Sequence, residues 1–111
     1  MANKILSIKK KIDFINVTKS SKIYKSKSLI LRKLYDNNLK NSSKVGYMVT
    51  KKLGNAVKRN RAKRIMRELV KRNVPKYEKY NFFYVLIAKK AIFDTSFENL
   101  EKEFVELLLK K

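Results

Sequence analysis

The sequence predicts an α/β (α+β) two-layer sandwich, a single domain over residues 1–111 in which helices cover one mixed β-sheet. Three observations lead to this prediction. The chain of 111 residues is enough for one domain and hardly for two. A strand pattern, a helical pattern and a second strand pattern follow one another from Val45 to Ala88, which implies a parallel pair joined by a crossover helix. The whole chain reads helix, two or three strands, helix, strand, helix.

The N-terminal half predicts a short helix followed by strands. A first helix is expected around residues 10–19, because isoleucine recurs at helical spacing at Ile5, Ile8, Ile12 and Ile15. Residues 29–35 and 45–50 have strand patterns, and residues 23–24 can form a third, short strand. The segment 36–43 is rich in Asp, Asn and Ser, which favour turns. The two longer strands are therefore expected to pair as a hairpin.

The C-terminal half predicts helix, strand, helix. Asn55 is a suitable N-cap for a helix that ends near Arg72, before Pro75. The unbroken apolar run 82–88 predicts a central strand that is buried on both faces. Thr95 and Glu98 have the spacing of a capping box. The last helix then carries one apolar stripe, formed by Phe97, Leu100, Phe104, Leu107 and Leu108.

The charge of the chain indicates a polyanionic partner. There are 29 Lys and Arg residues against 9 Asp and Glu residues, and the net charge at pH 7 is +20. Like charges repel one another in a compact chain, and binding to nucleic acid relieves that repulsion. Scattered Lys can also reflect the base composition of an AT-rich genome, so the positions of the Arg residues decide between the two explanations.

The missing residue types exclude several functions. The chain has no Cys and no His, which removes disulfides, thiol catalysis, the commonest general base and the commonest metal ligand. Nothing in the pattern argues for a paired-carboxylate metal site. No apolar run has the length of a membrane span, and the N-terminus lacks a signal-peptide core. We therefore expect a soluble, cytoplasmic protein without a membrane partner. The acids expected on the solvent face of the last helix are Glu98, Glu101, Glu103 and Glu106.

The basic residues of segment 51–72 are sorted by helical period. The apolar positions that form one face of this helix are Ala62, Ile65, Met66, Leu69 and Val70. The residues that project from much of the opposite face are Asn60, Lys63, Arg64, Arg67 and Lys71. Arg binds phosphate through a planar fork, and a helix N-terminus after a glycine turn favours anions. A solvated basic face is the alternative, but this density of Arg favours nucleic acid.

Residues 51–68, KKLGNAVKRNRAKRIMRE, closely resemble the signature of the bacterial ribonuclease P protein. The likeness is ungapped and centres on Arg59-Asn60-Arg61, and Asp13-Phe14, Val45-Gly46 and Ala88-Lys89-Lys90 extend it over nearly the whole chain. The resemblance implies a protein subunit that is itself monomeric. It also implies an endonuclease whose catalyst is a large RNA, which removes the 5′ leader of precursor tRNA with Mg²⁺ bound mainly by that RNA. No catalytic or metal-binding residue is then expected in the protein. The family's left-handed crossover, against the usual right-handed rule, is expected as well.

The resemblance also assigns roles to residues. It implies that the helix faces the catalytic RNA through Lys51, Lys52, Asn55, Arg59, Asn60, Arg61, Lys63, Arg64 and Arg67. It implies a cleft for the single-stranded leader, with Phe14, Ile30 and Met48 at cleft positions. Phe14 can stack on a base or belong to the core. Thr18 and Arg32 stand where the family usually has aromatic residues, so this cleft is expected to rely more on charge.

Other functions fit less well. A ribosomal or other rRNA-binding protein has the same size and charge, but the Gly-Asn-Ala-Val-Lys-Arg-Asn-Arg run argues against it. A protein nuclease needs a general base or a metal cage. A helix-turn-helix protein needs two adjacent short helices, whereas strands flank the basic helix here. A basic amphipathic membrane helix is conceivable, but the apolar stripe of residues 62–70 is better placed against a sheet.

Overall fold

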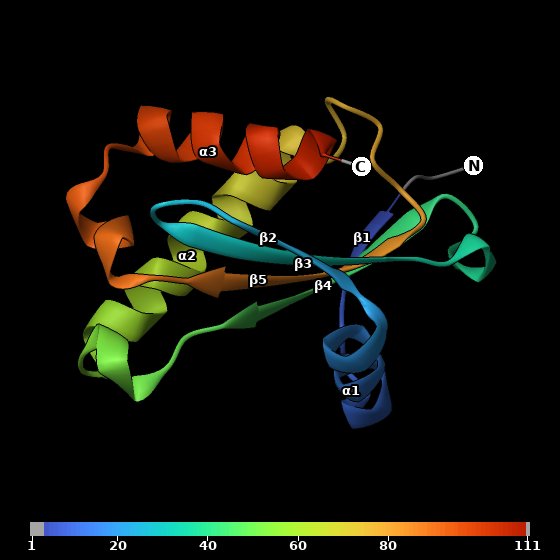
Figure 1. Ribbon diagram of the computed structural model, residues 1–111, viewed down its shortest axis with the longest axis horizontal. Helices are drawn as coiled ribbons and strands as arrows, with labels where there is room; N and C mark the ends of the chain where they lie inside the picture. The colour runs from blue at the N-terminus through green and yellow to red at the C-terminus, as the bar shows by residue number, and fades with distance from the viewer. Residues whose placement is uncertain (1–3, 111) are drawn as a thin grey trace.

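The computed structural model describes residues 4–110, which form a five-stranded sheet with three α-helices (Figure 1). Three short 3-10 helices, η1 to η3, lie in the connections. The predicted α/β sandwich is confirmed. In chain order the elements are β1 (Lys4–Ser7), α1 (Lys11–Ser20), β2 (Lys22–Lys25), β3 (Leu29–Tyr35), η1 (Asn37–Leu39), β4 (Ser42–Met48), η2 (Lys51–Leu53), α2 (Ala56–Asn73), β5 (Phe82–Ala88), η3 (Lys90–Asp94) and α3 (Phe97–Leu109).

The central position of the sheet belongs to β5. The strand order is β1-β4-β5-β3-β2, in which β4 runs parallel to both β1 and β5, and β3 runs antiparallel to both β5 and β2. Strand β5 is apolar at every position, and most of its residues are buried. A strand without polar side chains is most stable with neighbours on both edges and helices on both faces, so the prediction of a central strand is confirmed.

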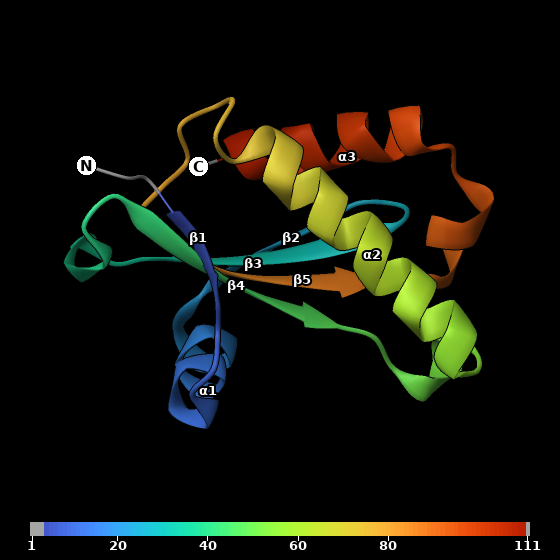
Figure 2. The same ribbon diagram turned by 180° about the vertical axis from the view of Figure 1, so that it is seen from behind.

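The crossover from β4 through α2 to β5 is left-handed. Viewed with α2 toward the reader, as in Figure 2, β4 and β5 both run from left to right, and β5 lies above β4. The usual right-handed connection would place β5 below β4 in this view. The expected left-handed crossover is therefore confirmed.

The helices divide the sheet into two unequal faces. Figure 1 shows α3 on one side of the sheet and α1 on the other, and α2 packs with α3. The face toward α2 and α3 carries the main core, where Tyr84, Leu86 and Leu31 meet Met66 and Phe104 and each is at most 1% exposed. The opposite face has a small cluster formed by Ile8, Val17, Phe83 and Val85. Much of the sheet beyond α1 is therefore open on this second face.

Two parts of the predicted topology are wrong. Ile5 belongs to strand β1, beside β4, and not to a helical stripe, so the predicted order lacked its first strand. Strands β3 and β4 do not form a hairpin, because β5 lies between them. The physical reason is that β5 is apolar on both faces and takes the central place. The strand predicted at residues 45–50 is β4, which begins and ends earlier, at Ser42 and Met48.

The N-terminal caps of the two long helices follow local rules. Asn55 caps α2 as predicted, because its Oδ1 accepts a hydrogen bond of 3.0 Å from Lys58 N. For α3 the capping residue is Ser96, whose Oγ accepts from Asn99 N. The predicted cap Thr95 instead donates to the Ala91 carbonyl at 2.8 Å. Within residues 4–110, no helix has both the length and the apolar composition to cross a membrane.

Four acids were predicted on the solvent face of α3, but two of them, Glu101 and Glu103, are half-buried. Glu101 Oε2 accepts a hydrogen bond from Asn73 Nδ2 at 3.1 Å. Glu103 Oε1 accepts hydrogen bonds from Ser26 Oγ at 2.7 Å and from Ser28 N at 2.9 Å, and its Oε2 accepts from Ser28 Oγ at 3.1 Å. Burial alone raises the pKa of Glu103, but the hydrogen bonds from Ser26 and Ser28 and the charge of Lys27 outweigh burial and lower it. Glu103 thus ties α3 to the turn between β2 and β3.

Replacing Glu103 by Gln is expected to lower the free energy of unfolding by about 0.5–1.5 kcal/mol, because Gln keeps one acceptor oxygen but loses the charge at a partly exposed position. Because folding lowers the pKa of this carboxyl, its contribution is complete above the unfolded pKa of about 4.3 and is lost as the pH falls through the folded value. Urea denaturation at neutral and at acidic pH measures both effects. Glu106→Gln, at an exposed position of the same helix, is the control, and equal losses in the two variants would contradict this role.

Candidate nucleic-acid interface

The basic segment begins with a tight turn that leads into α2. Lys51 and Lys52 are exposed on η2, and Gly54 follows with φ 127°, a backbone conformation that side chains disfavour. Asn55 then caps the helix. The first N–H groups of a helix and its dipole favour an anion at this end. The turn therefore places two lysines beside a helix N-terminus that is already suited to phosphate.

Helix α2 has one buried face and one basic face. Ala62, Met66, Leu69 and Val70 are at most 1% exposed and pack on the sheet and α3, as their spacing predicted, and Ile65 is half-buried. The opposite side carries Asn60, Arg61, Arg64 and Arg67, which are all exposed, while Lys63 is half-buried. We call the predicted RNA-contacting set the α2 basic face: Lys51, Lys52, Asn55, Arg59, Asn60, Arg61, Lys63, Arg64 and Arg67.

One flank of the α2 basic face lies against the sheet. The Arg67 guanidinium lies over the Tyr47 ring of β4, 5.8 Å from the ring centre. Burial raises the pKa of Tyr47 to about 12, against the opposing effect of the Arg67 charge. Arg59 is half-buried, and its Nε is buried without a hydrogen-bond partner among the residues that the structure describes.

On the other flank of α2, acidic residues mark the end of the basic face. Arg72 contacts Glu68 of the same helix at 3.5 Å and Glu101 of α3 at 3.8 Å, and its guanidinium lies over the Phe97 ring. In the described part of the chain, these are the only side-chain ion pairs, and both involve Arg72. The charges of the α2 basic face are therefore not neutralised within residues 4–110. Such a surface attracts polyanions.

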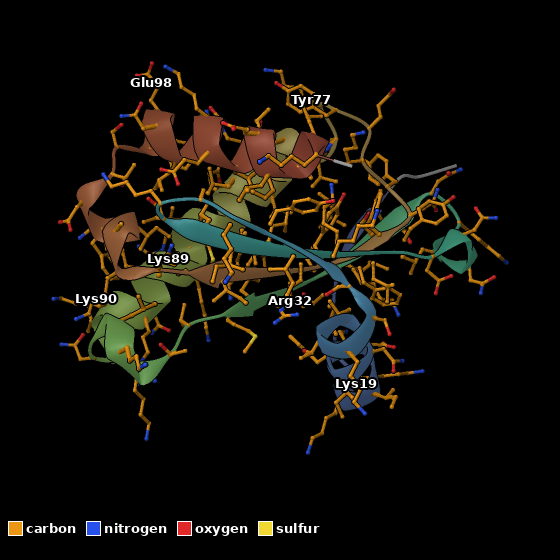
Figure 3. The ribbon with its side chains drawn as sticks, in the orientation of Figure 1. Lys19, Arg32, Tyr77, Lys89, Lys90 and Glu98 are labelled. Atoms are coloured by element: carbon orange, nitrogen blue, oxygen red, sulfur yellow. The ribbon has the colours of Figure 1, made fainter. Side chains whose placement is uncertain are left out.

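A second candidate surface lies on the sheet face that α1 only partly covers. Strand pairing brings Met48, Ile87 and Ile30 into one row and Gly46, Val85 and Arg32 into the next, and paired residues have side chains on the same face. Arg32 Nη1 donates to the Thr18 carbonyl of α1 at 3.1 Å, and Figure 3 shows Arg32 on the α1 side of the sheet. The structure therefore brings together the residues predicted for the leader, which we call the α1-side surface: Phe14, Thr18, Ile30, Arg32 and Met48.

Phe14 is both a packing residue and an accessible one. It is half-buried and packs against the small cluster around Val17 and Phe83. A Cβ atom at Gly46 would overlap the tip of the Phe14 ring, so glycine is required for this close approach. Thr18 is exposed, and its Oγ1 donates to the Phe14 carbonyl at 2.9 Å. The partly open ring leaves both sequence interpretations of Phe14, core and stacking, with physical support.

Some residues of both surfaces were not predicted from the sequence. Lys58 is exposed on the first turn of α2, next to Gly54, and its place in the basic run was a sufficient signal. On the α1 side, Ile23 is opposite Arg32 and is 44% exposed, while Ile87 lies between Ile30 and Met48. These two isoleucines could be found only with the strand register, because the sequence does not reveal that Ile23 pairs with Arg32 or that β5 lies between β3 and β4.

The acidic residues do not form a metal centre in the described part of the chain. Among residues 4–110, no group of three or more Asp and Glu side chains could hold a metal ion. Mg²⁺ in proteins is usually held through carboxylates.

Sequence comparison connects the chain to one family. A family model described as Ribonuclease P matches residues 2–111. The ribonuclease P protein component of Clostridioides difficile is 32% identical over 106 residues, which are 96% of this chain and 91% of that protein. The ribonuclease P protein component of Finegoldia magna is 40% identical over 73 residues, which are 66% of this chain and 64% of that protein.

Solved structures have the same architecture. The RNase P protein of Staphylococcus aureus matches with a TM-score of 0.77 and 28% identity, covering 99% of this chain and 97% of that chain. The RNase P protein of Thermotoga maritima matches with a TM-score of 0.74 and 24% identity, covering 86% of this chain and 88% of that chain. The second likeness concerns the fold alone.

Proposed function

The chain belongs to the ribonuclease P protein family, and from this we propose that its α2 basic face binds the RNA subunit of ribonuclease P while its α1-side surface binds the 5′ leader of precursor tRNA. The chain is the protein subunit of ribonuclease P, the endonuclease that removes the 5′ leader of tRNA, and it works with the RNA subunit. The alternative of a ribosomal protein is not favoured, because the family match spans residues 2–111.

The observation that carries the RNA-binding proposal is the sorting of charge on α2. Three exposed arginines of the helix, Arg61, Arg64 and Arg67, have no acidic partner within the described residues. The helix N-terminus beside Lys51 and Lys52 adds backbone donors. The guanidinium fork matches phosphate oxygens bidentately. The target of this face is therefore an RNA backbone.

The proposal for the leader relies on stacking and charge together. The Phe14 ring is partly accessible, and a base can stack on it without regard to sequence. Arg32 and the exposed apolar residue Met48 flank it on the sheet. A single strand that crosses this surface then places its bases on apolar side chains and its phosphates near Arg32. The surface adjoins the α2 basic face, because Met48 ends β4 three residues before η2 begins at Lys51.

Catalysis is assigned to the RNA subunit, together with the Mg²⁺ that this subunit holds. The chain has no His and no Cys, and among residues 4–110 no three or more acids gather into a cluster that could hold a metal ion. The protein contributes positive charge, which lowers the repulsion between the RNA subunit and precursor tRNA. The protein is expected to reduce the concentration of Mg²⁺ that the reaction needs.

Site-directed cleavage of RNA from a single cysteine tests the orientation of α2. The chain has no Cys, so one cysteine introduced at Val57, which is 76% exposed on α2, can carry an iron–EDTA group. The same group attached to Glu106→Cys, at an exposed position of α3, is the control. In the reconstituted holoenzyme we expect strong, localised cleavage of the RNA subunit from position 57 and weak cleavage from position 106. The reverse pattern would contradict the proposed orientation.

Gly46→Ala tests the α1-side surface. The added Cβ overlaps the Phe14 ring and lies 2.6 Å from its Cε1 atom, so the ring has to move. We expect affinity of the holoenzyme for precursor tRNA with a leader to fall roughly five- to tenfold, the lower part of the range for one base stack. Binding of mature tRNA, which lacks the leader, is the control and should not change. An equal loss for both RNAs would place Gly46 outside leader recognition.

A further inference from the structure

A cavity of about 500 Å³ lies at the edge of the sheet, mainly on the face opposite the α1-side surface. Its floor is formed by residues of β2, β3 and β5. Its rim is formed by the last residue of α1, by Lys79 of the loop before β5 and by Lys110 after α3. Sites for small ligands are roughly 300–1,000 Å³ in volume, so a nucleotide fits by size. The residues that line the cavity are Ser20, Lys22, Tyr24, Lys33, Leu34, Tyr35, Lys79, Phe82 and Lys110.

All charged side chains that line the cavity are lysines. Four lysines contribute, and no acidic side chain of the described residues lines the cavity. Lys33 is only 8% exposed. Burial and then the charges of Lys79 and Lys22 lower the pKa of Lys33 to about 8. Positive charges that repel one another in a cavity favour an anion between them.

The buried lysine is fixed in position by the end of α3 and by two aromatic rings. Lys33 Nζ donates to the Leu108 carbonyl at 2.8 Å and to the Lys110 carbonyl at 2.6 Å, at the end of α3. The same nitrogen lies over the rings of Tyr24 and Phe82, at 5.2 and 5.5 Å from their centres. The position of the charge is therefore well defined.

An exposed aromatic ring stands at the rim of this cavity. Tyr35 is 59% exposed, which is unusual for a large aromatic side chain, and its ring meets the Phe82 ring edge-on at 5.4 Å. Phe82 in turn stacks with Tyr84 at 5.4 Å. Tyr35 is thus supported from one side, with its remaining surface accessible. Rings of this kind serve as platforms for nucleobases, because every base has a π-face.

We propose that this cavity binds a nucleoside monophosphate unit, with its phosphate on Lys22, Lys79 and Lys110 and its base on Tyr35. The unit is either a free nucleotide or one residue of a single-stranded RNA. The site is distinct from the leader surface, because Arg32 and Lys33 are neighbours on β3 and neighbouring side chains of a strand point to opposite faces. It goes beyond the proposed function and does not depend on it.

Titration of the isotope-labelled protein with 5′-AMP, followed by NMR of its amide groups, tests the proposal. AMP is expected to shift the amides of Tyr24, Lys33, Tyr35 and Phe82 more than those of Phe14 or Arg64. Tyr35→Leu should weaken binding at this site roughly fivefold or more, the lower end for one base stack, while Tyr35→Phe should retain it. Lys79→Ala should weaken AMP binding about two- to fivefold, but Lys102→Ala, an exposed lysine outside the cavity, should not.

Further ligands show which part of the nucleotide is recognised, and whether the site binds a free nucleotide or a strand of RNA. Adenosine and inorganic phosphate, each alone, should bind more weakly than AMP. Tighter binding of a tetra-adenylate at the same amides would support a strand of RNA as the ligand, and binding of AMP without the tetra-adenylate would support a free nucleotide. Shifts confined to the α1-side surface or α2, or equal binding by Tyr35→Leu, would overturn the proposal. Processing of precursor tRNA is measured in a separate assay. A lack of AMP binding in the cavity would therefore not contradict the proposed function.

Discussion

Replacing Arg61, Arg64 and Arg67 together by alanine is expected to weaken binding to the RNA subunit on the order of 100-fold, because each exposed charge-assisted contact contributes roughly 1 kcal/mol. The three side chains are exposed on one side of α2 and have no acidic partner in the described chain. The slope of log K against log salt should also fall, by somewhat under 1 for each lost phosphate contact. Filter binding of the RNA subunit over a range of salt concentrations measures both quantities.

A triple lysine variant controls for the loss of charge. Lys27, Lys76 and Lys102 are exposed and lie outside α2 and η2, so their replacement by alanine removes the same charge from other surfaces. We expect a small loss of affinity and nearly the same salt slope for this variant. If the two triple variants lose affinity and slope equally, binding depends on net charge alone, and the assignment of the RNA to the α2 basic face is wrong.

Phe104→Ala is expected to lower the free energy of unfolding by about 3–5 kcal/mol, the usual cost of removing a buried aromatic ring and leaving a cavity. Phe104 is 1% exposed and joins α3 to the main core. Small domains have about 5–15 kcal/mol of stability in total, so a large part of the stability is lost. Urea denaturation measures the loss.

The matched control for Phe104 is Leu109→Ala on the same helix. Leu109 is 42% exposed, and a surface substitution usually changes stability by less than about 0.5 kcal/mol. Equal losses in the two variants would mean that α3 does not pack through the stripe that contains Phe104. An intact stripe matters for function as well, because α2 packs on α3 and on the sheet, and this packing orients the α2 basic face outward.

Local patterns predicted the helices and the basic face correctly. The spacing of Ala62, Met66 and Leu69 determined which side of α2 is buried, and the basic side then followed from the helical period alone. Asn55 as the N-cap was equally predictable, because capping depends on residues within one turn. These features could be predicted because each depends on residues that are close together in the sequence.

The pairing of strands that are distant in the sequence could not be predicted in the same way. Strand β1 has four residues with little apolar alternation, and its place beside β4 depends on an edge that only the folded sheet provides. The hairpin between β3 and β4 was a reasonable prediction from the turn-rich segment 36–43, but β5 occupies the position between them. The position of Glu103 at the β2–β3 turn, 75 residues away from Ser28 in the chain, likewise depends on tertiary packing.

Processing of precursor tRNA at low Mg²⁺ tests the central claim most directly. Three reactions are compared: the RNA subunit alone, this protein alone, and both together, with activity of the RNA subunit at high Mg²⁺ as the control. The proposed function predicts 5′-leader removal only in the mixture. Cleavage by the protein alone would contradict the assignment of catalysis to the RNA, and an RNA subunit that is active at high Mg²⁺ but gains nothing from the protein would contradict the proposed role of the chain.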